Sequence, residues 1–188
     1  MRLICYFVLT FLLAQSPAWS MIYSGVITKS TDKSFRIKES RIGKTFELIF
    51  VSPHIAKMAA NLKVNDFISF DGSRSSTTNT IRVNSINYVG LKDLIARWKG
   101  DDNYCYDFSS FTELLIYPSV KSICQEPGFL FRKYAYTVNP SEPDWMILLS
   151  DNQANYIADL VLKNGKSVEM SLYDSNTGDI LKFIKLRK

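Results

Sequence analysis

Residues 94–108, LIARWKGDDNYCYDF, lie between two strand-rich halves of the chain and decide how those halves connect. Apolar side chains recur around this stretch at helical spacing, so we predict a short helix that packs on an apolar surface. These side chains are Leu91, Leu94, Ile95 and Trp98. Asp101 and Asp102 follow as a solvated turn, and YCYDF resumes the alternation of a strand. We interpret the stretch as a junction and not as an active site.

The chain on the N-terminal side of the junction alternates apolar and polar residues as β-strands do. Strands are predicted at IYSGVIT, SFRIKE, TFELIFV, DFISFDG and TIRVNSINYV. Between the third and the fourth, Ser52 is a helix N-cap and Pro53 suits the first helical position. The sequence therefore predicts three strands, one short helix and two more strands.

This order resembles the oligonucleotide/oligosaccharide-binding (OB) fold, a five-stranded Greek-key barrel with its helix between strands three and four. The resemblance covers residues 22–89 and is one of topology and pattern, without a diagnostic motif. It implies a small closed barrel with one short helix.

Beyond the junction the chain again predicts strands, the last four spaced about ten residues apart. Asn164-Gly165 is a hairpin signal, and Ser175–Asp179, which contains Gly178, is a second turn. The pattern predicts an antiparallel meander or small barrel, and the fold class is mainly β.

The segment Ala96-Arg97-Trp98 resembles the entrance of lipocalin-like domains, where a tryptophan closes one end of an up-and-down barrel. This chain lacks the glycine that precedes that tryptophan in the family. The resemblance implies that a late basic residue, Arg187 or less favourably Lys185, stacks on Trp98 as a cation–π pair. The other interpretation makes Trp98 a buried anchor between the two halves.

The first 20 residues have the pattern of a signal peptide. Arg2 precedes an apolar run over Leu3–Ala14, and Ala18-Trp19-Ser20 suits cleavage after Ser20. The run is shorter than the roughly 20 apolar residues of a membrane span. We expect an exported protein, periplasmic or secreted, with no membrane span in the mature chain. The predicted parts are a signal peptide over 1–20, an OB-like domain over 21–90 and a lipocalin-like β domain over 91–188.

Cys105 and Cys124 are the cysteines that remain after cleavage. An oxidising compartment favours a disulfide between them over a metal pair or a nucleophile.

Charge is distributed unevenly between the halves. Residues 21–90 hold ten Lys/Arg and five Asp/Glu, whereas residues 91–188 hold twelve and thirteen. Aromatic side chains among cations on a barrel face can bind anionic chains. The candidate binding residues are Phe35, Arg36, Lys38, Arg41, Lys44, Arg74 and Arg82. The favoured interpretation places the phenylalanines inside the barrel, and we do not expect nucleic acid as a partner.

Catalytic signatures are weak. His54 is the single histidine of the sequence and lies at the start of the short helix, which disfavours a Ser-His-Asp or Cys-His arrangement. We expect no metal and no cofactor. The function we predict is a non-enzymatic exported binding or adaptor protein. Its OB-like half would contact a protein or an anionic envelope polymer, and its second half would add a surface or a small apolar pocket.

The alternative is a small exported hydrolase with a carboxylate pair in the C-terminal half. Two acids would then have to converge in a cleft. The candidates are Asp107, Glu113, Glu142, Asp144 and Asp159.

Overall fold

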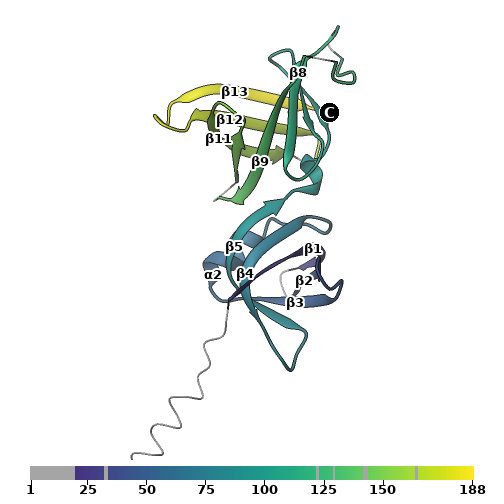
Figure 1. The fold of residues 1–188 in the computed structure, drawn as a ribbon, viewed down its shortest axis with the longest axis vertical. Helices are drawn as coiled ribbons and strands as arrows, with labels where there is room; N and C mark the ends of the chain where they lie inside the picture. Colours follow the sequence, from purple (N-terminus) through teal and green to yellow (C-terminus); the bar gives the residue numbers. More distant parts are fainter. Residues whose placement is uncertain (1–19, 32–33, 122, 129, 142–143, 164) are drawn as a thin grey trace, which may run out of the picture.

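The computed structural model describes residues 20–188 except 32–33, 122, 129, 142–143 and 164. The predicted signal peptide therefore lies outside the described residues, apart from Ser20. The described chain is mainly β, as predicted, and its strands join into one 13-stranded sheet that closes on itself twice (Figure 1).

The first closed ring contains five strands. They are β1 (Met21–Thr31), β2 (Ser34–Glu39), β3 (Thr45–Phe50), β4 (Phe67–Arg74) and β5 (Thr80–Gly90). β1 pairs with β2 and β4, β2 with β3, and β5 with β3 and β4. The β3–β5 pair is parallel and the others are antiparallel. The order around this five-stranded ring is thus 1-2-3-5-4.

Local sequence explains these elements. In β2, Phe35 and Ile37 are buried while Arg36 and Lys38 are exposed, so the alternation places one face in the core. The helix α2 (Pro53–Ala59) begins at the predicted cap, where the Ser52 hydroxyl accepts the Ile55 N–H at 3.3 Å.

The second closed ring is an antiparallel meander of eight strands. They are β6 (Arg97–Gly100), β7 (Tyr104–Phe108), β8 (Glu113–Pro118), β9 (Arg132–Pro140), β10 (Trp145–Ser150), β11 (Asn155–Lys163), β12 (Ser167–Asp174) and β13 (Ile180–Arg187). Each strand pairs with the next, and β13 returns to β6 through Leu186 and Arg187. The predicted turns after β11 and β12 contain Gly165 and Gly178, both at positive φ.

The helix predicted over residues 91–98 is wrong for most of its length. A single 3₁₀ turn, η1 (Lys92–Leu94), is followed by strand β6, which contains Trp98. Helical spacing misled the prediction because Leu91, Leu94 and Trp98 are buried in one tertiary core and not along one face of a helix. The β13 strand needs a partner to close the ring, and residues 97–100 supply it.

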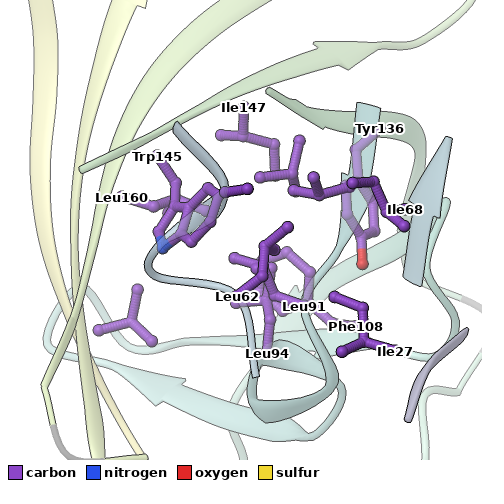
Figure 2. Packing of buried hydrophobic residues seen from close by; sticks show 14 of the residues in the cluster. Ile27, Leu62, Ile68, Leu91, Leu94, Phe108, Tyr136, Trp145, Ile147 and Leu160 are labelled. Atoms are coloured by element: carbon purple, nitrogen blue, oxygen red, sulfur yellow. The ribbon is translucent and has the colours of Figure 1, made fainter. Parts of the chain in front are cut away.

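The two rings share one continuous hydrophobic core. Leu91 and Leu94 of the connection are buried in a cluster with side chains from both rings, some of which Figure 2 labels. Ile27 and Leu62 come from the first part of the chain, and Trp145 comes from β10. In addition, β5 and β9 pair at Val89 and Val138. β5 ends at Gly90, where the sequence predicts the domain boundary, and the division into two domains stays a prediction.

Candidate ligand-binding site

A cavity of about 660 Å³ opens at one mouth of the eight-stranded ring. Its wall combines aliphatic side chains with tyrosines and a few charges. The lining aliphatic residues are Ile116, Leu130, Leu149, Met170, Leu172 and Ile184, and the tyrosines are Tyr104, Tyr106, Tyr134 and Tyr156. Its size lies within the usual 300–1,000 Å³ range of small-molecule pockets.

The strand order explains why these side chains meet. Asp102 lies in the β6–β7 turn, Leu130 and Phe131 precede β9, and Lys182 lies near the start of β13. In a meander these positions all lie at one end of the ring. The β8–β9 loop stands at the end away from the five-stranded ring (Figure 1).

Asp102 is the acid of the cavity, and its side chain is 10% exposed. Its carboxylate accepts hydrogen bonds from the Tyr106 hydroxyl at 2.6 Å, from the Lys182 ammonium and from the Tyr104 backbone N–H at 3.1 Å. Burial acts to raise the pKa of Asp102, but the hydrogen bonds from Lys182, Tyr106 and Tyr104 together hold it below the ordinary value of 3.8. Asp102 is therefore a carboxylate at neutral pH.

Tyr106 remains a hydrogen-bond donor under the same conditions. Burial, and then the hydrogen bond to Asp102, raise the pKa of its phenol well above the ordinary value of 10.0. The hydroxyl thus stays protonated and stabilises the Asp102 carboxylate through the hydrogen bond that it donates.

Two cations lie at the cavity wall. The Lys182 ammonium lies 5.7 Å from the Tyr104 ring centroid, and Asp102 compensates its charge. Arg132 is exposed at the start of β9, and its interaction with Tyr134 raises the pKa of the guanidinium. The lining charges sum to one positive, which favours a ligand with an anionic group.

The predicted disulfide is present and anchors the β8–β9 loop beside the cavity. Cys105 of β7 and Cys124 of the loop are joined at 2.07 Å, with their Cα atoms 5.7 Å apart. The same loop carries Leu130, which lines the cavity while 81% exposed, and the half-exposed Phe131. An apolar rim of this kind is available for contact with a ligand.

Trp98 is fully buried, and its indole N–H donates to the Leu94 carbonyl at 2.8 Å. The cation over its ring is the Lys188 ammonium, 4.7 Å from the centroid. The sequence pointed to Arg187 or Lys185 instead. Arg187 is exposed and pairs across the ring seam with Lys99. Strand alternation turns its side chain outward, because the neighbouring Leu186 is buried in the core.

The basic residues predicted in the first half are not all brought together. Phe35 is buried in the core, and Arg36, Lys38, Lys44 and Arg82 are exposed. Arg41 and Arg74 both line a second hollow of about 450 Å³ in the five-stranded ring.

The carboxylates of the hydrolase alternative have separate local partners. Asp107 accepts from Arg97 at 3.1 Å, Glu113 pairs with Lys133, and Asp159 accepts from the Tyr173 hydroxyl at 3.0 Å. Asp144 lies at two further hollows between the rings, of about 550 and 290 Å³, and Glu142 lies outside the described residues.

The sequence reasoning missed Asp102 and Lys182. It treated Asp102 as part of a solvated turn, whereas a phenol and an ammonium converge on this carboxylate. A usable signal was present in ILKFIKLR, because Lys182 falls on the same face as Ile184 and Leu186. A lysine on the inward face of a strand indicates a buried partner or a cavity.

Within the described ranges, no three His, Cys, Asp or Glu side chains are placed to hold a metal ion. Among the same residues, no helix has the length and apolar character to span a membrane. Comparisons with protein-family models, with curated proteins and with solved structures find no match for this chain.

Proposed function

We propose that this chain is an exported, non-enzymatic binding protein whose eight-stranded ring holds a small amphipathic ligand. The observation that carries the proposal is the cavity at the mouth of the ring, with its apolar walls and one excess positive charge. An apolar body would fill the space between the tyrosines and the aliphatic side chains. An anionic group would lie near Lys182 and Arg132.

The arrangement of the strands supports this function. An eight-stranded antiparallel meander with a buried tryptophan in its first strand resembles a lipocalin, and rings of this size can hold one small ligand. The five-stranded ring, in the order 1-2-3-5-4 with a helix between β3 and β4, is OB-like. In the proposed function, the five-stranded ring contacts a protein or an anionic polymer.

Export is part of the same proposal. The disulfide between Cys105 and Cys124 fits an oxidising compartment such as the periplasm or the extracellular space. The signal peptide predicted over residues 1–20 would deliver the chain there.

Two fluorescent probes that differ mainly in charge test the cavity. Anilinonaphthalene sulfonate carries an anionic group, and N-phenylnaphthylamine is neutral. We expect both to bind with a blue-shifted emission, because both ring systems suit the apolar wall. Leu172→Trp should lower the affinity for both probes because the larger side chain fills the cavity. Val161→Trp lies at a partly exposed position outside the lining and should change neither affinity.

Charge variants separate the two parts of the proposed ligand. Lys182→Met should lower the affinity for the sulfonate probe more than the affinity for the neutral probe. Lys185→Met, at an exposed position three residues further along the same strand, should leave both affinities unchanged. Saturable binding that Leu172→Trp does not alter would place the ligand elsewhere and refute the proposal.

A further inference from the structure

The second hollow lies in the five-stranded ring, far along the chain from the cavity of the eight-stranded ring. It holds about 450 Å³, and its lining includes residues of β1, β4 and the β2–β3 turn. Two arginines, Arg41 and Arg74, line it together with Tyr23 and Phe46. Because the two linings share no residue, a ligand in this hollow is independent of the ligand proposed for the other ring.

Arg74 is held over an aromatic ring. Its guanidinium carbon lies 4.8 Å from the centroid of Phe46, which is 1% exposed and belongs to the core. A cation–π contact holds a guanidinium beside the ring without being a hydrogen bond to it. The contact with Phe46 therefore positions the Arg74 guanidinium at the hollow.

Arg41 is held by the backbone. One of its terminal nitrogens donates to the Ile22 carbonyl at 2.8 Å. The β2–β3 turn that carries it is fixed in turn by Glu39, whose carboxylate accepts the N–H groups of Arg41 at 3.0 Å and Ile42 at 2.9 Å. Both arginines are thus partly ordered before any ligand arrives, which lowers the entropy cost of binding.

The rest of the lining is apolar and partly open to solvent. Met21 is 51% exposed and Ile42 is 52% exposed, and both line the hollow beside Tyr23. Glu39 also lines it, but this carboxylate is 3% exposed and already accepts two backbone N–H groups. The side-chain charges of the lining therefore sum to one positive, next to apolar surface.

We propose that this hollow binds a carboxylate that is attached to an apolar group, as presented by a peptide segment of a partner protein. Arginine forks match the planar carboxylate and can bind it through two parallel hydrogen bonds. The neighbouring apolar group would cover Met21 and Ile42. A bare hydrated anion would leave these two side chains exposed, which is why we favour the carboxylate with an apolar neighbour over inorganic phosphate.

The test uses the full mature chain and N-acetylphenylalanine, with N-acetylphenylalaninamide as its neutral counterpart. Nitrogen-15 NMR follows the side-chain Nε–H signals of Arg41 and Arg74. We expect saturable shifts with the acid and at least tenfold weaker binding of the amide. Arg41→Gln and Arg74→Gln should each lower the affinity for N-acetylphenylalanine about tenfold, which is the contribution of one charge-assisted hydrogen bond.

Controls distinguish a site from a general charge effect. Arg36→Gln and Arg82→Gln remove the same charge from exposed positions of the same ring, and we expect less than a twofold change. Arg74→Lys keeps the positive charge but loses the planar, forked guanidinium, so it should also lower the affinity for N-acetylphenylalanine. Thermal melting checks that each variant is folded.

Three results would overturn the proposal. The first is equal binding of the acid and the amide. The second is a loss of affinity for the acid in Arg36→Gln and Arg82→Gln as large as in Arg41→Gln and Arg74→Gln. The third is saturation of the same signals by inorganic phosphate, with no response to N-acetylphenylalanine.

Discussion

Asp102 shows how one side chain organises the cavity of the eight-stranded ring. Its carboxylate accepts from a phenol and a backbone N–H of β7 and from an ammonium of β13. Because the ladder between β13 and β6 pairs Leu186 and Arg187, the Lys182–Asp102 contact adds a side-chain link across the seam of the ring beyond that pairing. Asp102 therefore both joins the strands at the barrel mouth and contributes a negative charge to the cavity wall.

We predict that Asp102→Asn destabilises the protein by about 1–3 kcal/mol at pH 7, because Lys182 and Tyr106 lose a charged acceptor. The pKa of this carboxyl is lowered on folding, so its contribution is present at neutral pH. It is lost as the pH falls through the ordinary value of 3.8 and then through the lower pKa of the folded state. Urea unfolding of wild type and variant at pH 7 and pH 3 measures the difference.

Asp159→Asn is the matched control for this prediction. Asp159 accepts a hydrogen bond from the exposed Tyr173 hydroxyl at 3.0 Å, so its loss should cost less than about 0.5 kcal/mol. A stability gap for Asp102→Asn that is as large at pH 3 as at pH 7 would show that packing, not the carboxylate, is responsible.

At the scale of single elements, the β8–β9 loop is held in place by a disulfide. Among the described residues of this loop, Val120 and Ile123 form an isolated bridge. The disulfide from Cys124 to the buried Cys105 anchors the loop to β7. Leu130 and Phe131 reach the cavity from this anchored loop.

We predict that reduction of the disulfide lowers the free energy of unfolding by about 3 kcal/mol, the chain-entropy value for a loop of this length. The cysteines are 19 residues apart in the sequence. Unfolding curves with and without a phosphine reductant measure the loss. The variant Cys105→Ala with Cys124→Ala should not respond to the reductant, and an unchanged wild-type curve would contradict the prediction.

At the scale of the whole molecule, Phe111 connects the two rings. It lies in the β7–β8 turn of the eight-stranded ring, and its ring stacks on Phe67 of β4 with centroids 6.0 Å apart. A Cβ atom added at Gly90 would lie 2.5 Å from the Phe111 ring, so this position needs glycine for the close approach. Together with the shared core, these contacts favour joint unfolding of the two halves.

We predict one calorimetric transition for the wild type and a broader or split transition for Phe111→Ala, because the variant loses aromatic packing between the rings. Phe183→Ala is the control, since Phe183 is half exposed on β13. A single sharp transition in Phe111→Ala would mean that the shared core alone couples the halves.

Local pattern was enough to predict much of this protein. The alternation in β2, the Ser52-Pro53 start of α2 and the glycines after β11 and β12 each act within a few residues. Their physical causes are side-chain direction, backbone capping and positive φ, all of which can be read along the chain. The pairing of Cys105 with Cys124 also followed, because the predicted signal-peptide cleavage leaves these two cysteines to pair.

The tertiary structure alone decided the remaining features. Residues 97–100 form a strand because β13 needs a partner, and Lys188 reaches Trp98 because the outward side chain of Arg187 cannot. Asp102 meets Lys182, 80 residues later, only when the ring closes. Arg41 and Arg74 line one hollow because the β2–β3 turn and the end of β4 lie beside it. Such contacts depend on long-range strand order, which hydrophobic periodicity does not encode.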